Sequence, residues 1–244
     1  MAGNLLLEDG NNKIMIRKRS KKTISAPHDA FTVSISDLMA GLLSIFILAL
    51  TYFMLNLTQV TQQYTGNTEK RNQILQNIQM KMNERGVKVT IDSKQGVLRI
   101  PESVLFDQGE ADVKAEGQQA VVVLSQVLYE VLTEEEYRNS VETIFIEGHT
   151  DNVPIENNRF HSNWELSTQR AINTWNLMRL DQPDLNKLIN PNGQPLFSCS
   201  GYADTRPVID DGYDESSEEG RQANRRIDIR FTMIPPSNPA KDDN

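Results

Sequence analysis

The stretch VSISDLMAGLLSIFILALTYFMLNL, residues 33–57, is the one long apolar run of the chain and decides its class. At a rise of about 1.5 Å per residue, a helix of this length extends about 37 Å, which is enough to cross about 30 Å of hydrocarbon with some tilt. A cleaved signal peptide would have a shorter apolar core followed by small residues, whereas Ala49 continues into the bulky apolar stretch 50–55. We therefore expect an uncleaved transmembrane helix over residues 33–57.

The charges on either side of this run predict its orientation. Six of the 25 Lys and Arg residues fall between Lys13 and Lys22, and after the run none appears until Lys70. Because positively charged flanks are retained on the cytoplasmic side of a membrane, residues 1–32 are expected to form a basic cytoplasmic tail. The rest of the chain is then expected on the opposite side.

Asp37 is the one ionisable residue in the predicted span. A carboxylate in a membrane helix costs about 2.5–3.5 kcal/mol on insertion scales, so its presence calls for a reason. Small and polar residues recur with it at spacings of three and four, which is typical of a face that packs against another helix. This stripe contains Ser34, Asp37, Gly41, Ser44, Leu48, Thr51 and Leu55. Such a carboxylate can carry a proton or a sodium ion; the alternative is a boundary residue near the headgroups.

Residues 58–87 are expected to form a linker, with a break at Gly66-Asn67 and a short amphipathic helix that ends at Gly86. The apolar face of this helix contains Ile74, Leu75, Ile78 and Met82. Two interpretations remain open. The helix either packs on its own domain or pairs with a second copy of the chain.

From residue 87 onward the pattern alternates between strands and helices, which predicts an α/β domain with a mixed sheet. The helix near residue 164 has a clear start, because Ser162 and Glu165 match a capping box. Expected strands are 87–91, 97–100, 142–147, 196–202 and 226–233, and expected helices are 113–132 and 164–180.

Several functions are disfavoured by composition and motifs. The net charge of −8 argues against nucleic acid as a direct partner, since phosphate binding needs clustered positive charge. No phosphate-binding G-x-x-x-x-G-K-[ST] motif is present. Cys199 is the sole cysteine, which excludes an intrachain disulfide. We expect a buried strand residue, and an intermolecular bridge is the alternative.

Two kinds of metal site are conceivable but disfavoured. Glu147, His149, Asp151 and His161 are possible ligands, but their spacing lacks the H-E-x-x-H pattern of zinc hydrolases. The acidic run at 210–219 lacks the spacing of a calcium-binding loop, so a solvated loop is the preferred interpretation. We expect no metal, no cofactor and no enzymatic activity.

Four motifs in order give the domain a family resemblance. They are IEGHTDNVPI (146–155), SNWELSTQRA (162–171), SGYADTRPV (200–208) and GRQANRRIDIRF (220–231). Together they resemble OmpA-like peptidoglycan-binding domains, here over residues 88–233, with a flexible tail at 234–244. GHTDNVP and SNWELS resemble the MotB-type flagellar stator B subunits in particular. The short linker and the ISDLMAGLLSIF span look more like ZorB, the B subunit of the Zorya anti-phage defence system.

The resemblance implies a subunit of an ion-driven motor in the inner membrane, with Asp37 as the ion carrier and protons as the expected ion. It implies a homodimer of this subunit within a ring of MotA-like A subunits, a linker that plugs the channel, and a periplasmic domain that grips peptidoglycan.

Diaminopimelate of the cell wall carries an ammonium group near a carboxylate, so its pocket needs an acid and a guanidinium. Asp151 and Arg170 match that pair, and Asn224 and Arg225 match a further family motif. A passive wall tether is the alternative, and Asp37 discriminates the two.

Overall fold

The computed structural model describes residues 27–208, 214 and 216–235. The basic tail expected before residue 27 lies outside the described residues, as do the end of the expected C-terminal tail (236–244) and part of the acidic run at 210–219. The chain forms two compact units, Met1–Thr58 and Gln59–Asn244.

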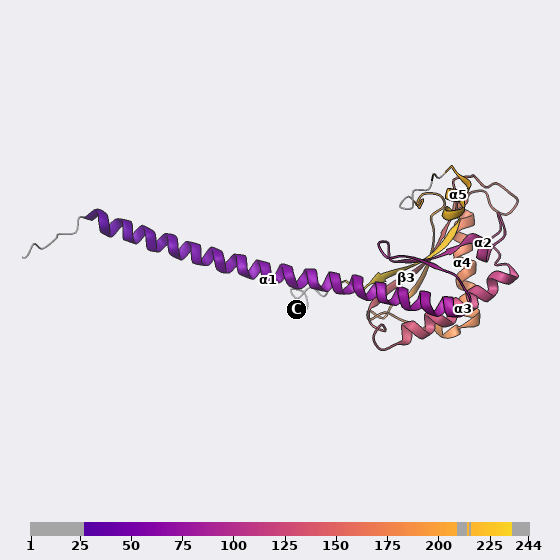
Figure 1. Cartoon of the computed structure of the whole chain (residues 1–244), viewed down its shortest axis with the longest axis horizontal. Helices are drawn as coiled ribbons and strands as arrows, with labels where there is room; N and C mark the ends of the chain where they lie inside the picture. The colour runs from indigo at the N-terminus through magenta and orange to yellow at the C-terminus, as the bar shows by residue number, and fades with distance from the viewer. Residues whose placement is uncertain (1–26, 209–213, 215, 236–244) are drawn as a thin grey trace, which may run out of the picture. The chain divides into compact units, whose positions relative to one another are not determined.

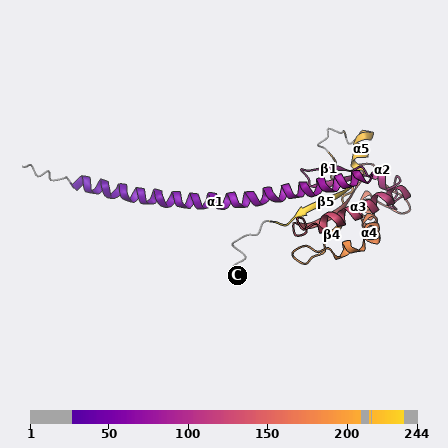
Figure 2. The same ribbon diagram turned by 60° about the horizontal axis from the view of Figure 1, so that its bottom comes forward.

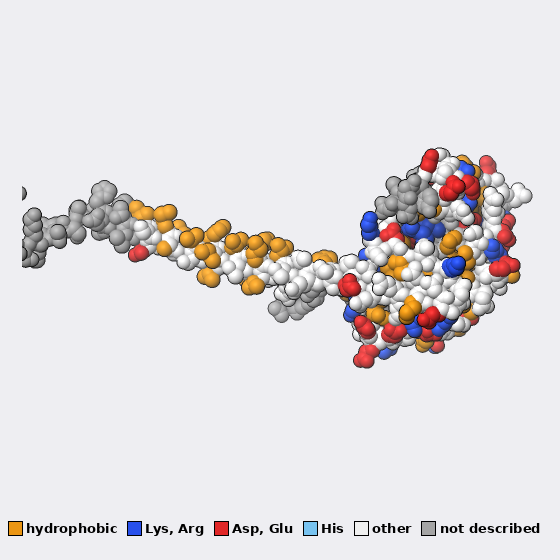
Figure 3. Space-filling model, in the orientation of Figure 1, with side chains coloured by type: hydrophobic (Ala, Val, Ile, Leu, Met, Phe, Trp, Pro, Cys, Tyr) orange, Lys and Arg blue, Asp and Glu red, His pale blue; other side chains and the backbone are white. Residues whose placement is uncertain are grey.

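The first helix, α1 (Pro27–Glu84), contains the whole predicted span. Its apolar side chains between Ile35 and Leu57 are exposed in the isolated chain, and Figure 3 shows them gathered along this part of the helix. The hydroxyls of Ser44 and Thr51 each donate to a carbonyl four residues earlier, at 2.8 Å, so both are satisfied within the helix. By length and composition, α1 can cross a membrane.

Helix α1 continues through Gly66 and Asn67, so the predicted break at these residues is wrong. A glycine inside a helix costs only about 1 kcal/mol relative to alanine, which is too little to end a helix that is stabilised on both sides. Asn67 is also held by tertiary structure, because its Nδ2 donates to the carbonyl of Ile234 at 2.6 Å.

The C-terminal part of α1 packs on its own soluble domain. Ile74, Leu75, Ile78 and Met82 are completely buried there, within one core that includes the helices and the sheet of this unit. At the helix end, Arg85 forms a 2.6 Å ion pair with Glu130. Of the two interpretations of this amphipathic segment, packing on its own domain is therefore the one confirmed, and its apolar face is not free for a second copy.

The soluble unit contains a five-stranded mixed sheet, as the sequence predicts (Figure 1). In spatial order its strands are β1 (Thr90–Asp92), β2 (Val97–Pro101), β5 (Arg226–Met233), β3 (Val141–His149) and β4 (Phe197–Gly201). Neighbouring strands are antiparallel except β3 and β4, which are parallel. Parallel strands need a crossover connection, and here it contains α4.

Two long helices, α3 (Ala115–Thr133) and α4 (Asn163–Asp181), lie along one side of the sheet (Figure 2). Apolar residues that alternate along the central strands, such as Ile144, Ile146, Ile227 and Ile229, are buried in the same core as these helices. Three short helices were not predicted: α2 (Glu102–Leu105), the 3₁₀ helix η1 (Pro183–Lys187) and α5 (Glu218–Asn224). Each is too short to produce a clear helical period in the sequence.

The capping box at the start of α4 is confirmed. The side chain of Ser162 accepts a hydrogen bond from the backbone N–H of Glu165 at 3.3 Å. The carboxylate of Glu165 reaches back to the N–H of His161, at 2.7 Å, one residue before the cap. Two otherwise unpaired donors are thereby satisfied, and the position of α4 at the end of the loop is fixed.

Candidate functional site

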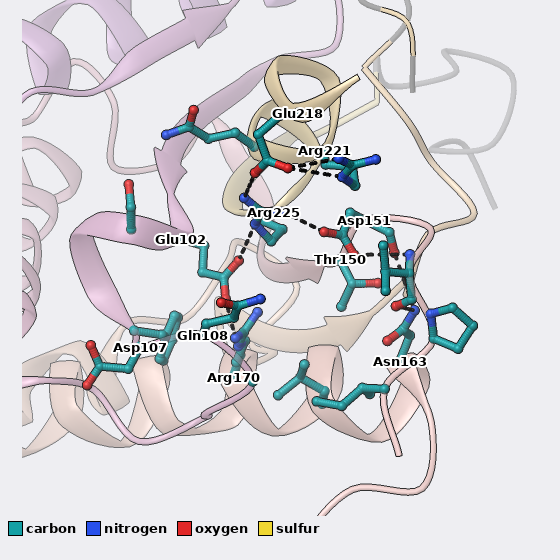
Figure 4. A pocket seen from close by; sticks show the side chains of 18 of the residues that line it. Glu102, Asp107, Gln108, Thr150, Asp151, Asn163, Arg170, Glu218, Arg221 and Arg225 are labelled. Carbon is teal, nitrogen blue, oxygen red and sulfur yellow. Dashed lines mark hydrogen bonds and ion pairs between the residues drawn. The ribbon is translucent and has the colours of Figure 1, made fainter. Parts of the chain in front are cut away.

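A pocket of about 440 Å³ opens where α2, the end of β3, the start of α4 and helix α5 meet (Figure 4). Segments far apart in the sequence contribute to it, from Glu102 to Arg225. Two buried polar atoms of its lining, Glu102 Oε2 and Thr150 Oγ1, have no hydrogen-bond partner among the residues that the structure describes. Glu102 Oε2 is nevertheless ion-paired with Arg225 Nε at 3.2 Å, and both atoms are buried, so neither is by itself an open ligand contact.

Arg170 forms one wall of the pocket, and its side chain is almost completely buried. Its Nη2 donates to Glu102 Oε1, and its Nε donates to the carbonyl of Glu110 at 2.8 Å. The guanidinium lies over the ring of Phe106, 5.1 Å from its centroid. Burial lowers the pKa of Arg170, and the neighbouring Glu102 carboxylate partly opposes this effect. These contacts hold the positively charged guanidinium of Arg170 in one orientation at the wall of the pocket.

Arg225 is the second guanidinium of the site and connects three carboxylates. Its Nη1 donates to Asp151 Oδ2 at 2.6 Å and its Nη2 to Glu218 Oε1 at 3.0 Å. Its Nε lies 3.2 Å from Glu102 Oε2. Burial alone would lower the pKa of Arg225, but the hydrogen bonds to Asp151 and Glu218 outweigh it and raise the pKa. Positive and negative groups therefore alternate from Arg170 through Glu102 and Arg225 to Asp151.

The loop after β3 places Asp151 at the pocket. Its Oδ1 accepts the backbone N–H of Val153 at 3.2 Å, and Asn163 at the start of α4 donates to the carbonyls of Asp151 and Val153 at 3.3 and 3.0 Å. Close packing of β3 on α4 requires a glycine at position 148, because a Cβ there would collide with the backbone carbonyl of Ser167. The GHTD motif thus combines a packing residue with a pocket residue.

The predicted wall-binding residues are partly brought together. Asp151, Arg170 and Arg225 line the same pocket, although Asp151 is paired with Arg225 and Arg170 with Glu102. Asn224 is buried away from the pocket lining, where its Oδ1 accepts the backbone N–H of Val208 at 2.7 Å. The role of these four residues in binding remains a prediction.

Glu102 was missed by the sequence analysis. It follows Pro101 at the end of β2 and begins the short helix α2, where its backbone N–H donates to the carbonyl of Arg225 at 2.9 Å. The available signal was a single acid next to a strand end and shortly before the apolar pair Val104-Leu105. That pattern is common on protein surfaces, so it does not by itself indicate a buried site residue.

Glu147, His149 and Asp228 form a second buried cluster, on the sheet face that carries the charged residues of β3 and β5. His149 Nε2 lies 3.8 Å from a Glu147 oxygen and 3.7 Å from an Asp228 oxygen. Of the four possible metal ligands named from the sequence, only Glu147 and His149 are in this cluster, because Asp151 lines the pocket.

Arginine side chains already neutralise the two carboxylates of this cluster. Arg230 binds Glu147 at 2.8 Å, while Arg99 and Arg226 bind Asp228 at 3.1 and 3.0 Å. A divalent cation would have to displace these guanidinium groups, so the cluster is better described as an internal ion-pair network. The alternation of charged and apolar residues in β5 suggests a half-exposed strand. With its arginines and Asp228 in this network, β5 is instead mostly buried.

Comparisons with known proteins give a family match and several relatives. Residues 105–221 match the OmpA family. Motility protein B of Bacillus subtilis (strain 168) is 32% identical over 159 residues, which cover 65% of this chain and 53% of that protein. The Zorya protein ZorB of Escherichia coli O139:H28 is 24% identical over 233 residues, which cover 91% of this chain and 87% of that protein. The chain thus spans about half the length of the Bacillus relative.

Solved structures share the fold. Among them is the crystal structure of a putative MotB-like protein from Desulfovibrio vulgaris, which is 22% identical, has a TM-score of 0.53, and covers 70% of this chain and 98% of that chain.

Proposed function

We propose that this chain is the wall-anchored B subunit of an ion-driven motor in the inner membrane, because residues 105–221 match the OmpA family and 159 residues are 32% identical to motility protein B of Bacillus subtilis. In this proposal α1 crosses the membrane with its N-terminus in the cytoplasm, and the soluble unit lies in the periplasm. Two copies stand within a ring of MotA-like A subunits, and protons move past Asp37 to drive the ring.

The observation that supports wall binding is the balanced charge of the pocket. Its lining contains four acidic residues, Glu102, Asp107, Asp151 and Glu218, and four basic ones, Lys114, Arg170, Arg221 and Arg225. The chain as a whole carries a net charge of −8, so this balance is local. Adjacent fixed charges of both signs suit a ligand with a neighbouring ammonium and carboxylate, which is the chemistry of diaminopimelate in peptidoglycan.

Wall binding is tested with the double variant Asp151→Asn, Arg170→Gln. We expect binding of the full chain to purified peptidoglycan to weaken by about 30-fold or more, because truncating one partner of a buried charge pair costs about 2–5 kcal/mol. Co-sedimentation with cell-wall sacculi measures it. Arg159→Gln is the matched control, since Arg159 is a half-exposed arginine in ion pairs outside this pocket. Unchanged sedimentation of a folded double variant would contradict wall binding at this pocket.

The membrane carboxylate supports ion transfer. Asp37 lies within the exposed apolar part of α1, and a charge there is costly in lipid unless protein surrounds it. The stripe of small residues around it gives neighbouring helices room to approach closely. A tether that only holds the wall has no need of such a group.

Replacing Asp37 with Asn tests ion transfer. We expect Asp37→Asn to abolish ion-dependent activity in cells while the protein still accumulates, inserts and binds peptidoglycan, because an amide cannot exchange a proton or bind sodium as a carboxylate does. Activity and membrane content are measured in the same cells, with Ser44→Ala as a control on the same stripe. Full activity of Asp37→Asn would favour the passive tether.

The share of each protein that the two matches cover favours a defence-type motor over a flagellar-type motor. The match with ZorB extends over most of both chains, whereas the match with motility protein B covers 53% of that longer protein. We therefore propose a Zorya-type anti-phage motor, with a flagellar-type stator as the alternative. Deleting the gene and comparing phage plaque counts with swimming zones separates them: a Zorya subunit changes the first and a flagellar one the second.

A further inference from the structure

A second hollow, of about 480 Å³, lies beside the start of α4 and shares no lining residue with the pocket described above. Its volume falls within the range of about 300–1,000 Å³ that is typical of small-ligand sites. The lining consists of Arg159, Phe160, Trp164, Glu165, Thr168 and Gln169. Trp164 is 51% exposed, so a large part of its indole ring is open to a ligand.

The backbone beneath this indole is held in place. Trp164 occupies the first turn of α4, between Ser162 and Glu165 of the capping box. One turn further on, Thr168 packs so closely on β4 that a Cβ at Gly201 would collide with its backbone and hydroxyl. Because the first turn is fixed in this way, little conformational entropy is lost when a ligand binds to the ring.

Polar groups with unused bonding capacity surround the indole. Glu165 Oε2 accepts the N–H of His161 at 2.7 Å, and Gln169 Nε2 donates to Asn173 Oδ1 at 2.8 Å. The other oxygen of Glu165, the oxygen of Gln169 and the indole N–H of Trp164 have no hydrogen-bond partner among the described residues. An aromatic face bordered by acceptors and a donor suits a pyranose ring, which presents C–H groups on its face and hydroxyls at its rim.

Arg159 also lines the hollow, but its charge is already neutralised. Its Nη1 lies 2.8 Å from both Glu110 and Asp112, and its guanidinium lies over the ring of Phe160, so we assign it no ligand contact. An anionic lipid surface would need clustered positive charge, and a stable protein interface buries about 800 Å² on each partner. With Phe160 only 6% exposed, Trp164 is the one large aromatic surface that this hollow offers. These features favour a small neutral ring over either alternative.

We propose that Trp164 is a stacking platform for the N-acetylated amino sugar to which the wall peptide is attached. This inference rests on the proposed wall-binding function and adds a glycan subsite to it. Residues two apart in an α-helix lie about 200° apart around its axis. Leu166 and Arg170 accordingly line the first pocket, while Trp164 and Thr168 line the second hollow. The two sites thus lie on opposite flanks of the start of α4.

The wall peptide is long enough to connect these sites. Diaminopimelate is its third residue, counted from the sugar. At about 3.3–3.6 Å per extended residue, three residues span about 10 Å, which is comparable with the helix diameter of about 10–12 Å. The peptide can therefore pass round the first turn of α4, with diaminopimelate in the first pocket and the sugar on Trp164.

The test compares two probes. One is a lactyl tripeptide that ends in diaminopimelate, and the other is the same tripeptide attached to N-acetylmuramic acid. Titration calorimetry uses the full chain in detergent. For the wild type, the sugar should tighten binding about tenfold, since truncating a central aromatic contact commonly costs that much. For Trp164→Ala, the sugar should change binding by less than about twofold, and the affinity for the lactyl tripeptide should equal that of the wild type.

Three further variants complete the design. Trp164→Phe retains a smaller ring and should keep part of the gain. Leu180→Ala removes a 76% exposed apolar side chain at the other end of α4 and should keep all of it. Trp175→Phe leaves Trp164 as the sole tryptophan, so its fluorescence should change when the sugar-bearing probe is added and not with the lactyl tripeptide.

The outcomes separate this inference from the proposed function. If Trp164→Ala keeps the tenfold gain, the indole is left to a protein partner and the glycan subsite is overturned, as it also is if the wild type shows no gain. If Trp164→Ala weakens both probes equally, Trp164 acts only through the start of α4, which overturns the subsite as well. In these cases peptide binding stands. A wild type that binds neither probe overturns wall-peptide binding itself, and the subsite with it.

Discussion

His149 lies on the sheet face that carries Glu147 and Asp228, and its surroundings shift its pKa. It is buried, its ring stacks on Tyr202 at 5.5 Å between centroids, and neither ring nitrogen has a hydrogen-bond partner among the described residues. Glu147 and Asp228 face it from β3 and β5, and both are held by arginines. Burial lowers the pKa of His149, with Arg226 adding to this effect and the two carboxylates opposing it.

The lowered pKa of His149 predicts acid sensitivity of the fold. Because the pKa is lower in the folded chain, the unfolded chain binds the proton more tightly. The contribution of His149 to stability is present above the unfolded pKa of about 6.5 and is lost as pH falls toward the folded pKa. Thermal unfolding of the full chain in detergent should show a melting temperature that decreases below about pH 6.5.

His149→Gln should remove this part of the decrease, whereas replacement of the exposed His161 should leave it. An identical pH profile for wild type and His149→Gln would contradict the assignment.

At the scale of elements, the most informative feature is the part of α1 that belongs to the soluble domain. One face of this helix is completely buried, as at Ile78, while Met80 two residues later is 55% exposed. The helix is also fixed at its end by ion pairs from Lys81 and Arg85 to Glu130 on α3. These contacts are the ordinary contacts of a core helix, so the segment is part of the domain.

Ile78→Ala is therefore expected to destabilise the soluble unit by about 2–5 kcal/mol, because it leaves a cavity in a packed core. Met80→Ala, in the same helix, should change stability by less than about 0.5 kcal/mol. Denaturant unfolding followed by circular dichroism measures both. If the two variants lost equal stability, α1 would not pack on the domain as described.

At the scale of the whole molecule, the division at Thr58/Gln59 separates a membrane-type helix from a unit with its own core. Every residue of the proposed wall-binding pocket lies in the second unit. In the proposed function, anchoring and ion transfer therefore belong to different parts of one chain.

A fragment that begins at Gln59 is expected to fold and to bind peptidoglycan without a membrane, since it retains the complete core and the complete pocket. Circular dichroism and wall sedimentation check both properties. A second fragment that begins at residue 88 removes the buried face of α1 and should be poorly folded. Equal stability of the two fragments would show that the linker segment is dispensable for the domain.

The sequence by itself determined the class of each part. The apolar run at 33–57, the alternating strands and the capping box at Ser162 are local patterns, and local patterns are set by side-chain periodicity and backbone hydrogen bonding. The resemblance of four ordered motifs to a family also pointed to Asp151, Arg170 and Arg225, which line one pocket and whose role in binding stays a prediction.

Only the tertiary structure decided which charges meet. Glu102 is 68 residues from Arg170 in the chain, and Asp151 is 74 from Arg225, yet each pair is in contact. Likewise, only packing showed that the amphipathic end of α1 is buried in its own domain. Contacts of this kind depend on how the helices and strands come together in space, which no local period of the chain specifies.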